Sequence, residues 1–133
     1  MPLLARRTLA VLLLCGLAAC AGIAPPPPGP EFSETGLASW YGRAHHRKRT
    51  ASGERFDMRQ MTAAHRRLAF GTVVRVTNIE TGQVVKVRIN DRGPYVRGRI
   101  IDLSSLAAER LGIADDGIAK VRLEVFAEDQ PSS

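Results

Sequence analysis

RINDRGPYVRGRIIDLS, residues 88–104, decides the fold, because it joins the end of one strand to a second strand through a loop of turn-forming residues. Apolar and charged side chains alternate over residues 84–89, which gives that strand one buried and one wet face. Residues 90–94 favour a turn, and Ile100 and Ile101 indicate a strand after Gly98. The stretch therefore predicts β-structure on both sides of a polar loop.

The segments around this stretch add further strands. Residues 73–77 are rich in branched side chains and are joined to residues 84–89 by a turn at 80–83, so the two segments should pair as a hairpin. Residues 119–125 alternate in the same way and predict a closing strand. Closing such a sheet into a barrel would remove its exposed edges.

Helix is scarce in this pattern. Ser104 or Ser105 should cap a short helix that runs through Leu111 and stops at Gly112. A second helical turn is expected around residues 63–68. The sequence thus predicts a small, mainly β domain with one or two short helices.

The first nineteen residues read as an export signal. Arg6 and Arg7 precede an apolar run that is too short to span a bilayer core of about 30 Å. The signal ends in Leu-Ala-Ala-Cys, which is typical of a bacterial lipobox, so we expect a lipid at Cys20; the alternative is an incidental cysteine. Ala21 follows where an aspartate would favour the inner membrane, so we expect an outer-membrane anchor facing the periplasm.

Four segments follow from these patterns: a signal peptide at 1–19, a lipidated cysteine with a proline-rich linker at 20–35, a folded domain at 36–125 and a flexible tail at 126–133. Removing the signal takes away two arginines and no acid, which lowers the formal charge from +6 to +4. A basic surface favours anionic partners such as lipid headgroups or cell-wall polymers. Nucleic acid is not an expected partner, because the chain is exported and shows no nucleic-acid motif.

Four motifs carry a resemblance to a known family: GLASWYG at 36–42, TASGERFD at 50–57, TAAHRRLAFG at 62–71 and the stretch at 88–104. Together they resemble the rare lipoprotein A (RlpA) family of septal lytic transglycosylases over nearly all of the folded domain. The resemblance implies a six-stranded double-psi β-barrel, similar in shape to family 45 endoglucanases and expansins. It also implies cleavage of peptidoglycan glycan strands, with a preference for strands stripped of stem peptides. We expect the protein to be a monomer.

The resemblance places Glu54, Asp57, His65 and Asp91 at the active-site positions of the family. A lytic transglycosylase needs an acid that protonates the glycosidic oxygen and a base that then takes the proton of the C6 hydroxyl, and one carboxyl group can do both. Asp91 is the candidate, since it resembles the acid aspartate of this barrel superfamily. Burial or a neighbouring carboxylate, Glu54 or Asp57, would have to raise its pKa from about 3.9. No metal or cofactor is needed.

Each assignment has a structural alternative. Asp91 lies in a turn-rich string where aspartate often caps backbone amides, Asp57 could cap the segment that follows it, and Glu54 could be a solvated loop charge. His65 either orients a carboxylate or is a structural polar residue inside the barrel. His45 and His46 do not suggest zinc, because adjacent histidines do not converge on one ion and no metal-ligand spacing appears.

Two residues are candidates for substrate binding. Tyr41 is expected near the cleft, where its ring could stack on a sugar, and Trp40 more inward. Arg92 either contacts sugar hydroxyls and the muramic lactyl carboxylate or pairs with Asp102. The alternative to the enzyme is a non-catalytic, expansin-like peptidoglycan-binding lipoprotein. A hydrolase would need a second carboxylate placed to activate water.

Overall fold

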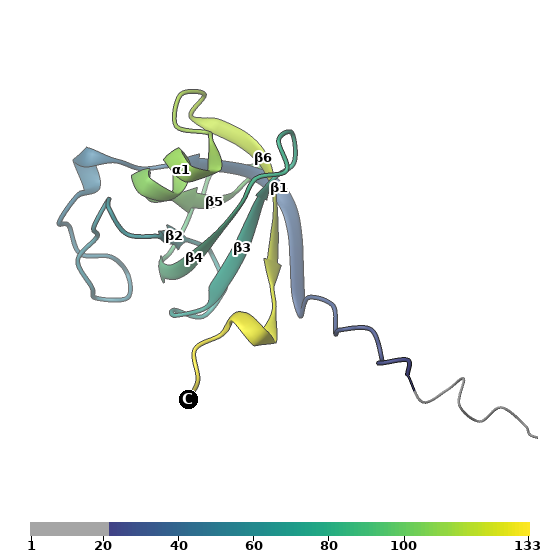
Figure 1. Cartoon of the computed structure of the whole chain (residues 1–133). Helices are drawn as coiled ribbons and strands as arrows, with labels where there is room; N and C mark the ends of the chain where they lie inside the picture. The colour runs from purple at the N-terminus through teal and green to yellow at the C-terminus, as the bar shows by residue number, and fades with distance from the viewer. Residues whose placement is uncertain (1–21) are drawn as a thin grey trace, which may run out of the picture.

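The computed structural model describes residues 22–133, so the predicted signal peptide and the lipid site at Cys20 lie outside the described residues. Six strands, one α-helix and two 3-10 helices form in this part of the chain (Figure 1). The strands are β1 Phe32–Trp40, β2 Thr62–Ala64, β3 Val73–Asn78, β4 Val84–Asp91, β5 Arg99–Leu103 and β6 Ile118–Val125. The helices are η2 Arg43–His45, α1 Ser105–Leu111 and η3 Ala127–Asp129. None of the helices within residues 22–133 has the length and apolar character that crossing a membrane requires.

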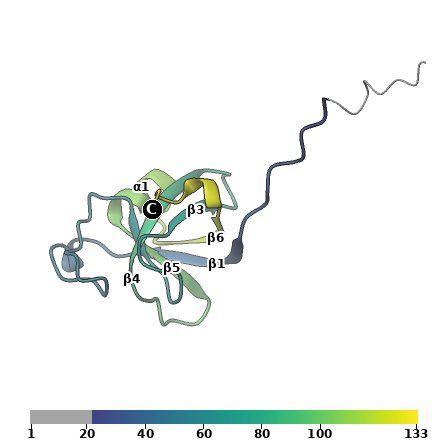
Figure 2. The ribbon, with the colours of Figure 1, turned by 90° about the horizontal axis from the view of Figure 1, so that it is seen from below.

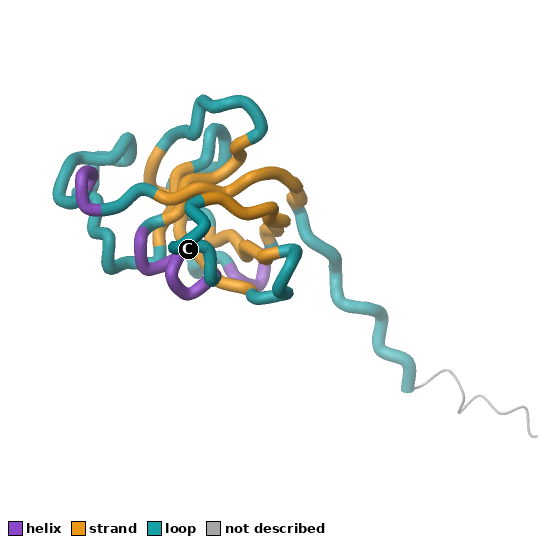
Figure 3. Tube along the Cα trace, turned by 90° about the horizontal axis from the view of Figure 1, so that it is seen from above, coloured by secondary structure: helices purple, strands orange, loops and turns teal. Residues whose placement is uncertain are grey.

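The six strands close into a barrel in the order β1-β5-β2-β4-β3-β6 (Figure 3). Two pairs, β1 with β5 and β2 with β4, are parallel, and the other neighbours are antiparallel. This arrangement confirms the predicted six-stranded double-psi β-barrel. Because residues 32–125 contain every strand and each strand has a partner on both sides, we expect residues 22–133 to fold without the segment before them.

The barrel interior is filled by the residues whose alternation predicted the strands. β4 buries Val85, Val87 and Ile89 and leaves Lys86 exposed, and it pairs with β3 as the expected hairpin. β6 alternates likewise, with Val121 and the later apolar positions buried. The fully buried side chains in this core are mostly branched and fit a closed sheet. Periodicity therefore placed these strands correctly.

One of the two expected helices forms. Ser104 caps α1 by accepting a hydrogen bond from the Ala107 N–H, and Gly112 ends it in the left-handed conformation at φ 78°. The expected helical turn at residues 63–68 is wrong, because part of the segment is strand β2 and the rest is bent. His65 Nδ1 accepts the N–H groups of Arg67 and Leu68 at 3.1 Å, and this local bonding replaces the helical pattern.

Both predicted domain boundaries differ from the structure. β1 begins at Phe32, which pairs with Val125 of β6, so the barrel starts before residue 36. The expected free tail is instead bound to β3 as far as Gln130, whose side chain bonds the N–H and carbonyl of Val73 at 2.9 Å. Charge explains the docking, because Asp129 lies 2.6 Å from the Arg75 guanidinium.

Asp129→Asn should lower the melting temperature by a few degrees at neutral pH. Arg75 and Lys86 lower the pKa of Asp129 to about 2, below the ordinary value of about 3.9. The carboxylate therefore stabilises the fold above pH 4, and this contribution is lost as the pH falls towards 2. Thermal unfolding of both proteins from pH 2 to 7 should show the difference shrinking with acid. Asp116→Asn, an exposed aspartate without an ion pair, is the control, and an equal effect of both changes would refute the role of the tail.

Candidate active site

Asp91 lies at the end of β4, in a pocket of about 170 Å³. The register of the parallel pair β2–β4 shifts here, since Ala63 pairs with Ile89 and Ala64 with Asp91, so that Asn90 is an extra residue in β4. Such a bulge changes the direction of the side chains beside it. The pocket is lined by Tyr41, His45, Lys48, Arg49, Thr50, Phe56, Ala64, Asp91, Arg92 and Asp102.

The two oxygens of the Asp91 carboxyl group differ in their surroundings. Oδ1 accepts hydrogen bonds from the backbone N–H of Ala51 at 2.8 Å and of Arg92 at 2.9 Å. Oδ2 makes no hydrogen bond to the described part of the chain. Asp91 thus caps backbone amides, as the structural alternative held, and still keeps one oxygen available to a ligand in the pocket.

Glu54 is not a solvated loop charge. Its two oxygens accept hydrogen bonds from the Arg88 guanidinium at 2.9 and 3.0 Å, and Oε1 also accepts from Asn90 Nδ2 at 2.7 Å. The hydrogen bonds from Arg88 hold the pKa of Glu54 below its usual range, although partial desolvation opposes them. Glu54 is therefore ionised at neutral pH and cannot donate a proton.

Tyr41 brings a neutral hydroxyl group among these carboxylates. Its ring centroid lies 4.6 Å from that of Phe56, and its hydroxyl group is buried without a hydrogen-bond partner in residues 22–133. Burial raises the pKa of Tyr41 above its usual range, and the charges of Asp91, Asp102 and Glu54 raise it further. The hydroxyl group therefore stays protonated at neutral pH. Tyr41 lines the pocket that holds Asp91.

Trp40 is the last residue of β1 and lines a different hollow from Tyr41, the residue that follows it. Its side chain packs partly against the core and lines a separate groove with Ser105, Glu109 and Asp115. Trp40 is therefore not part of the Asp91 pocket.

Arg92 lines the pocket, but its guanidinium group is bound to the protein. Nη1 donates to the carbonyl groups of His65 at 3.2 Å and Leu68 at 2.7 Å, and the group stacks on the Phe70 ring at 4.0 Å. The predicted alternative, a pair between Arg92 and Asp102, is wrong, because Asp102 pairs with Arg99 and accepts from Ser39. Arg92 fixes the loop that follows β2.

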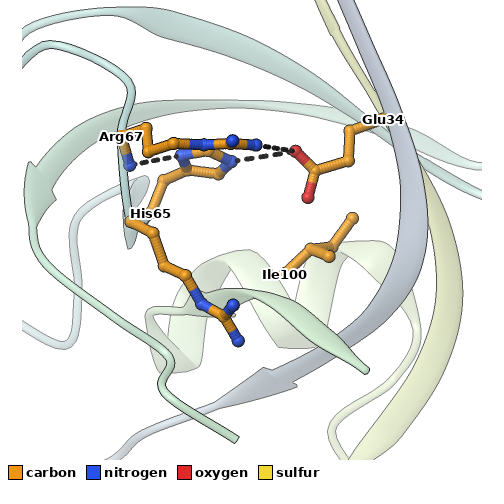
Figure 4. Close-up of a pocket in the computed structure, with 5 residues that line it drawn as sticks. Glu34, His65, Arg67 and Ile100 are labelled. Atoms are coloured by element: carbon orange, nitrogen blue, oxygen red, sulfur yellow. Dashed lines mark hydrogen bonds and ion pairs between the residues drawn. The ribbon is translucent and has the colours of Figure 1, made fainter. Parts of the chain in front are cut away.

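His65 lines a pocket with Glu34, Arg67 and Ile100 (Figure 4). Asp91 does not line this pocket, although the backbone N–H of His65 donates to the Asp91 carbonyl. The side chain is 2% exposed, and Nε2 lies 3.5 Å from the Glu34 carboxylate. Burial lowers the pKa of His65, and Glu34 partly opposes this. The His65 side chain is thus buried and faces a carboxylate, that of Glu34, and it does not line the pocket that holds Asp91.

Asp57 is also outside the Asp91 pocket. Its Oδ1 accepts the N–H of Arg59 at 2.9 Å, which is the capping role of the structural alternative. It lines another surface hollow with His46 and Arg55. Of the four residues placed at the active site by resemblance, only Asp91 lines this pocket. Glu54 acts on Tyr41 through its charge while it is paired with Arg88, and His65 and Asp57 line other hollows.

Sequence reasoning missed the two partners of Glu54. Arg88 and Asn90 stand two residues apart in β4, and period-two alternation could have placed them on one face of the strand. Nothing in the sequence indicated that residue 54, in a loop, would reach that face. Among residues 22–133, no group of three or more histidine, cysteine or acidic side chains could hold a metal ion.

The fold and this site define a small double-psi β-barrel with carboxylates and a buried tyrosine hydroxyl group at one pocket. The chain belongs to the lytic transglycolase family, whose sequence profile matches residues 33–123.

Curated relatives carry names from the same family. The chain is 57% identical over 90 residues to the probable endolytic peptidoglycan transglycosylase RlpA of Synechocystis sp., which covers 68% of this chain and 28% of that protein. It is 50% identical over 101 residues to the endolytic peptidoglycan transglycosylase RlpA of Vibrio cholerae, covering 76% of this chain and 38% of that protein. The chain thus spans less than two fifths of the length of either relative.

Solved structures support the fold. The Streptomyces papain inhibitor is 21% identical with a TM-score of 0.58, and the match covers 71% of this chain and 94% of that one. A mutant expansin of Clavibacter michiganensis in complex with cellohexaose is 20% identical with a TM-score of 0.60, covering 77% of this chain and 54% of that one. At this identity the likeness establishes the barrel and not an activity.

Proposed function

We propose that this chain is an endolytic peptidoglycan lytic transglycosylase that cleaves glycan strands between N-acetylmuramic acid and N-acetylglucosamine and leaves 1,6-anhydromuramic ends. It would prefer strands that lack stem peptides and act in wall remodelling or daughter-cell separation. The observation that carries the proposal is the Asp91 carboxyl group in a member of the lytic transglycolase family: two backbone amides anchor Oδ1, and Oδ2 has no donor among residues 22–133.

The chemistry needs one proton carrier. Asp91 Oδ2 gives its proton to the glycosidic oxygen as the bond from that oxygen to muramic C1 breaks. The Asp91 carboxylate then takes the proton of the C6 hydroxyl group of the same sugar while that oxygen bonds to C1. Asp91 is left protonated again, and no water enters the product. The charge of ionised Glu54, which reaches the pocket from outside its lining, would favour the positive charge that develops on the sugar. The Tyr41 ring lines the pocket beside Asp91 and offers an aromatic face to the substrate.

A second candidate is a non-catalytic glycan-binding lipoprotein. The observation that favours it is the ion pair between Glu54 and Arg88. This pair neutralises the Glu54 carboxylate, as expected of a structural residue and not of a catalytic one. A binding module would use the same pocket without proton transfer.

Product analysis distinguishes these functions. Residues 22–133 should be incubated with purified peptidoglycan, intact and amidase-stripped, and the released sugars analysed by mass spectrometry. Anhydro ends would support the transglycosylase, and reducing ends would show a hydrolase. Co-sedimentation with the wall without any release would leave the binding module.

We also propose that the protein is a monomer that is lipidated at Cys20 and anchored to the outer membrane facing the periplasm. The lipobox at residues 17–20 supports this placement. Metabolic labelling with a radioactive fatty acid should mark the full chain and not Cys20→Ser, and fractionation should place the label in the outer membrane. Label in both proteins would refute lipidation at Cys20. Label in the inner membrane would refute the outer-membrane location.

A further inference from the structure

The loop between β1 and β2 concentrates positive charge beside the Asp91 pocket. We call residues 43–59 the cationic loop. Its six exposed basic side chains are Arg43, Arg47, Lys48, Arg49, Arg55 and Arg59. The segment contains two acids, Glu54 and Asp57, and both are used within the protein, one by Arg88 and the other as a cap.

These basic side chains have no anionic partner in the described part of the chain. The ion pairs within residues 22–133 involve other cations, on the strands and at residues 65–67, and none from the cationic loop. Uncompensated like charges repel one another, so holding them together costs free energy. An anionic ligand would relieve that repulsion.

The loop is held in a defined shape. Phe56 is 2% exposed, and its backbone is hydrogen-bonded to Arg47 and Lys48 at 2.7 and 2.8 Å, as in a hairpin. The tip is bound to β4, because the Ala51 N–H donates to Asp91 Oδ1 and the Ser52 N–H donates to the Asn90 carbonyl. The same loop that carries the cations therefore anchors the candidate acid.

The position of the loop indicates what it meets. Lys48 and Arg49 line the Asp91 pocket, so a ligand in that pocket touches them. The linker enters the barrel at the start of β1 and the cationic loop leaves from its end, so the two lie at opposite ends of a nine-residue strand (Figure 1, Figure 2). A chain anchored through its linker would direct this loop away from the membrane and towards the wall.

We propose that the cationic loop binds the lactyl carboxylates of N-acetylmuramic acid that become free when stem peptides are removed, and thereby makes stripped strands the preferred substrate. The inference rests on the proposed function. In an intact strand the lactyl group forms an amide with the stem peptide and carries no charge of its own, and the carboxylates of the peptide lie further from the sugar. After an amidase acts, each disaccharide carries one carboxylate directly on its lactyl group, within reach of Lys48 and Arg49 when the sugar occupies the pocket.

Binding should be measured separately from catalysis, in residues 22–133 carrying Asp91→Asn. The charge variant adds Arg43→Gln and Lys48→Gln, whose side chains make no hydrogen bond to any other residue of the range 22–133. The matched control adds Arg110→Gln and Lys120→Gln on exposed positions of α1 and β6. The ligands are amidase-stripped strands and the same strands with their carboxylates converted to amides by carbodiimide and ammonia.

At low salt the charge variant should bind stripped strands about tenfold more weakly than its parent, and the control should not. The difference should vanish on amidated strands and shrink at high salt, because salt screens exposed charges. Equal binding of the charge variant and its parent to stripped strands, or an equal loss on both kinds of strand, would overturn the proposal. Stronger charge-dependent binding to phosphatidylglycerol vesicles than to stripped strands would also overturn it, in favour of a lipid surface.

The product assay with Asp91 intact distinguishes a failure of the inference on the cationic loop from a failure of the proposed transglycosylase reaction. Anhydro products from wild type together with a strand preference that the charge variant keeps would defeat the inference alone. The absence of products with charge-dependent binding intact would defeat the proposed reaction alone.

Discussion

Asp91→Asn should lower the release of anhydro-ended glycan by about 10²–10⁴-fold. The amide oxygen of asparagine can still accept the N–H groups of Ala51 and Arg92, so the pocket keeps its shape. The amide nitrogen cannot deliver a proton to the leaving oxygen or take one from the C6 hydroxyl group. Single-turnover assays on stripped strands, with products counted by mass spectrometry, measure the loss.

The melting temperature and the affinity for stripped strands serve as controls for this variant, and neither should fall with the rate. A variant that binds and unfolds like wild type and still turns over at the wild-type rate would show that Asp91 is not the proton carrier. The enzyme proposal would then need another acid, and ionised Glu54 cannot serve.

Glu54→Gln should lower the same rate by about 10²-fold while the protein stays folded. The change removes a negative charge that acts on the pocket through Tyr41 and would favour the developing positive charge on the sugar, and it leaves Arg88 without its ion pair. Glu80→Gln, an exposed glutamate in the turn between β3 and β4, is the matched control.

Stability gives this variant a second readout. Because Arg88 lowers the pKa of Glu54 in the folded state, the ionised carboxylate stabilises the fold above about pH 4.3 and loses that effect as the pH falls below it. Unfolding curves of wild type and Glu54→Gln should therefore converge in acid. An unchanged rate combined with lower stability at pH 7 would make Glu54 a structural residue only.

Several elements could be predicted because their information is local. Branched residues alternating with charged ones define β4 and β6, since side chains on a strand point to opposite faces. Ser104 and Gly112 mark the ends of α1 because capping depends on neighbouring residues in the chain.

The errors came where distant partners compete with local preference. Residues 63–68 read as helical, but Ala63 and Ala64 pair with β4 and β5 as part of β2, and His65 Nδ1 accepts two backbone N–H groups of the residues that follow. The tail reads as free because its polar residues have no local partner, yet Arg75 lies within reach once β3 is part of the barrel. Secondary-structure propensity depends on the local sequence, so it does not include contacts that form only in the closed sheet.

The sequence by itself determined the strands, the helix caps, the basic loop and, through its motifs, the family. Only the tertiary structure decided which polar residues share a site. Parallel pairing of β2 with β4 and the docked tip of the cationic loop bring Ala51 to Asp91, while the Glu54 carboxylate reaches the side chain of Arg88. The same closure turns His65 towards Glu34 and away from the candidate acid. These partners lie some thirty to forty residues apart in the chain, so side-chain periodicity, which describes neighbours, carries no information about them.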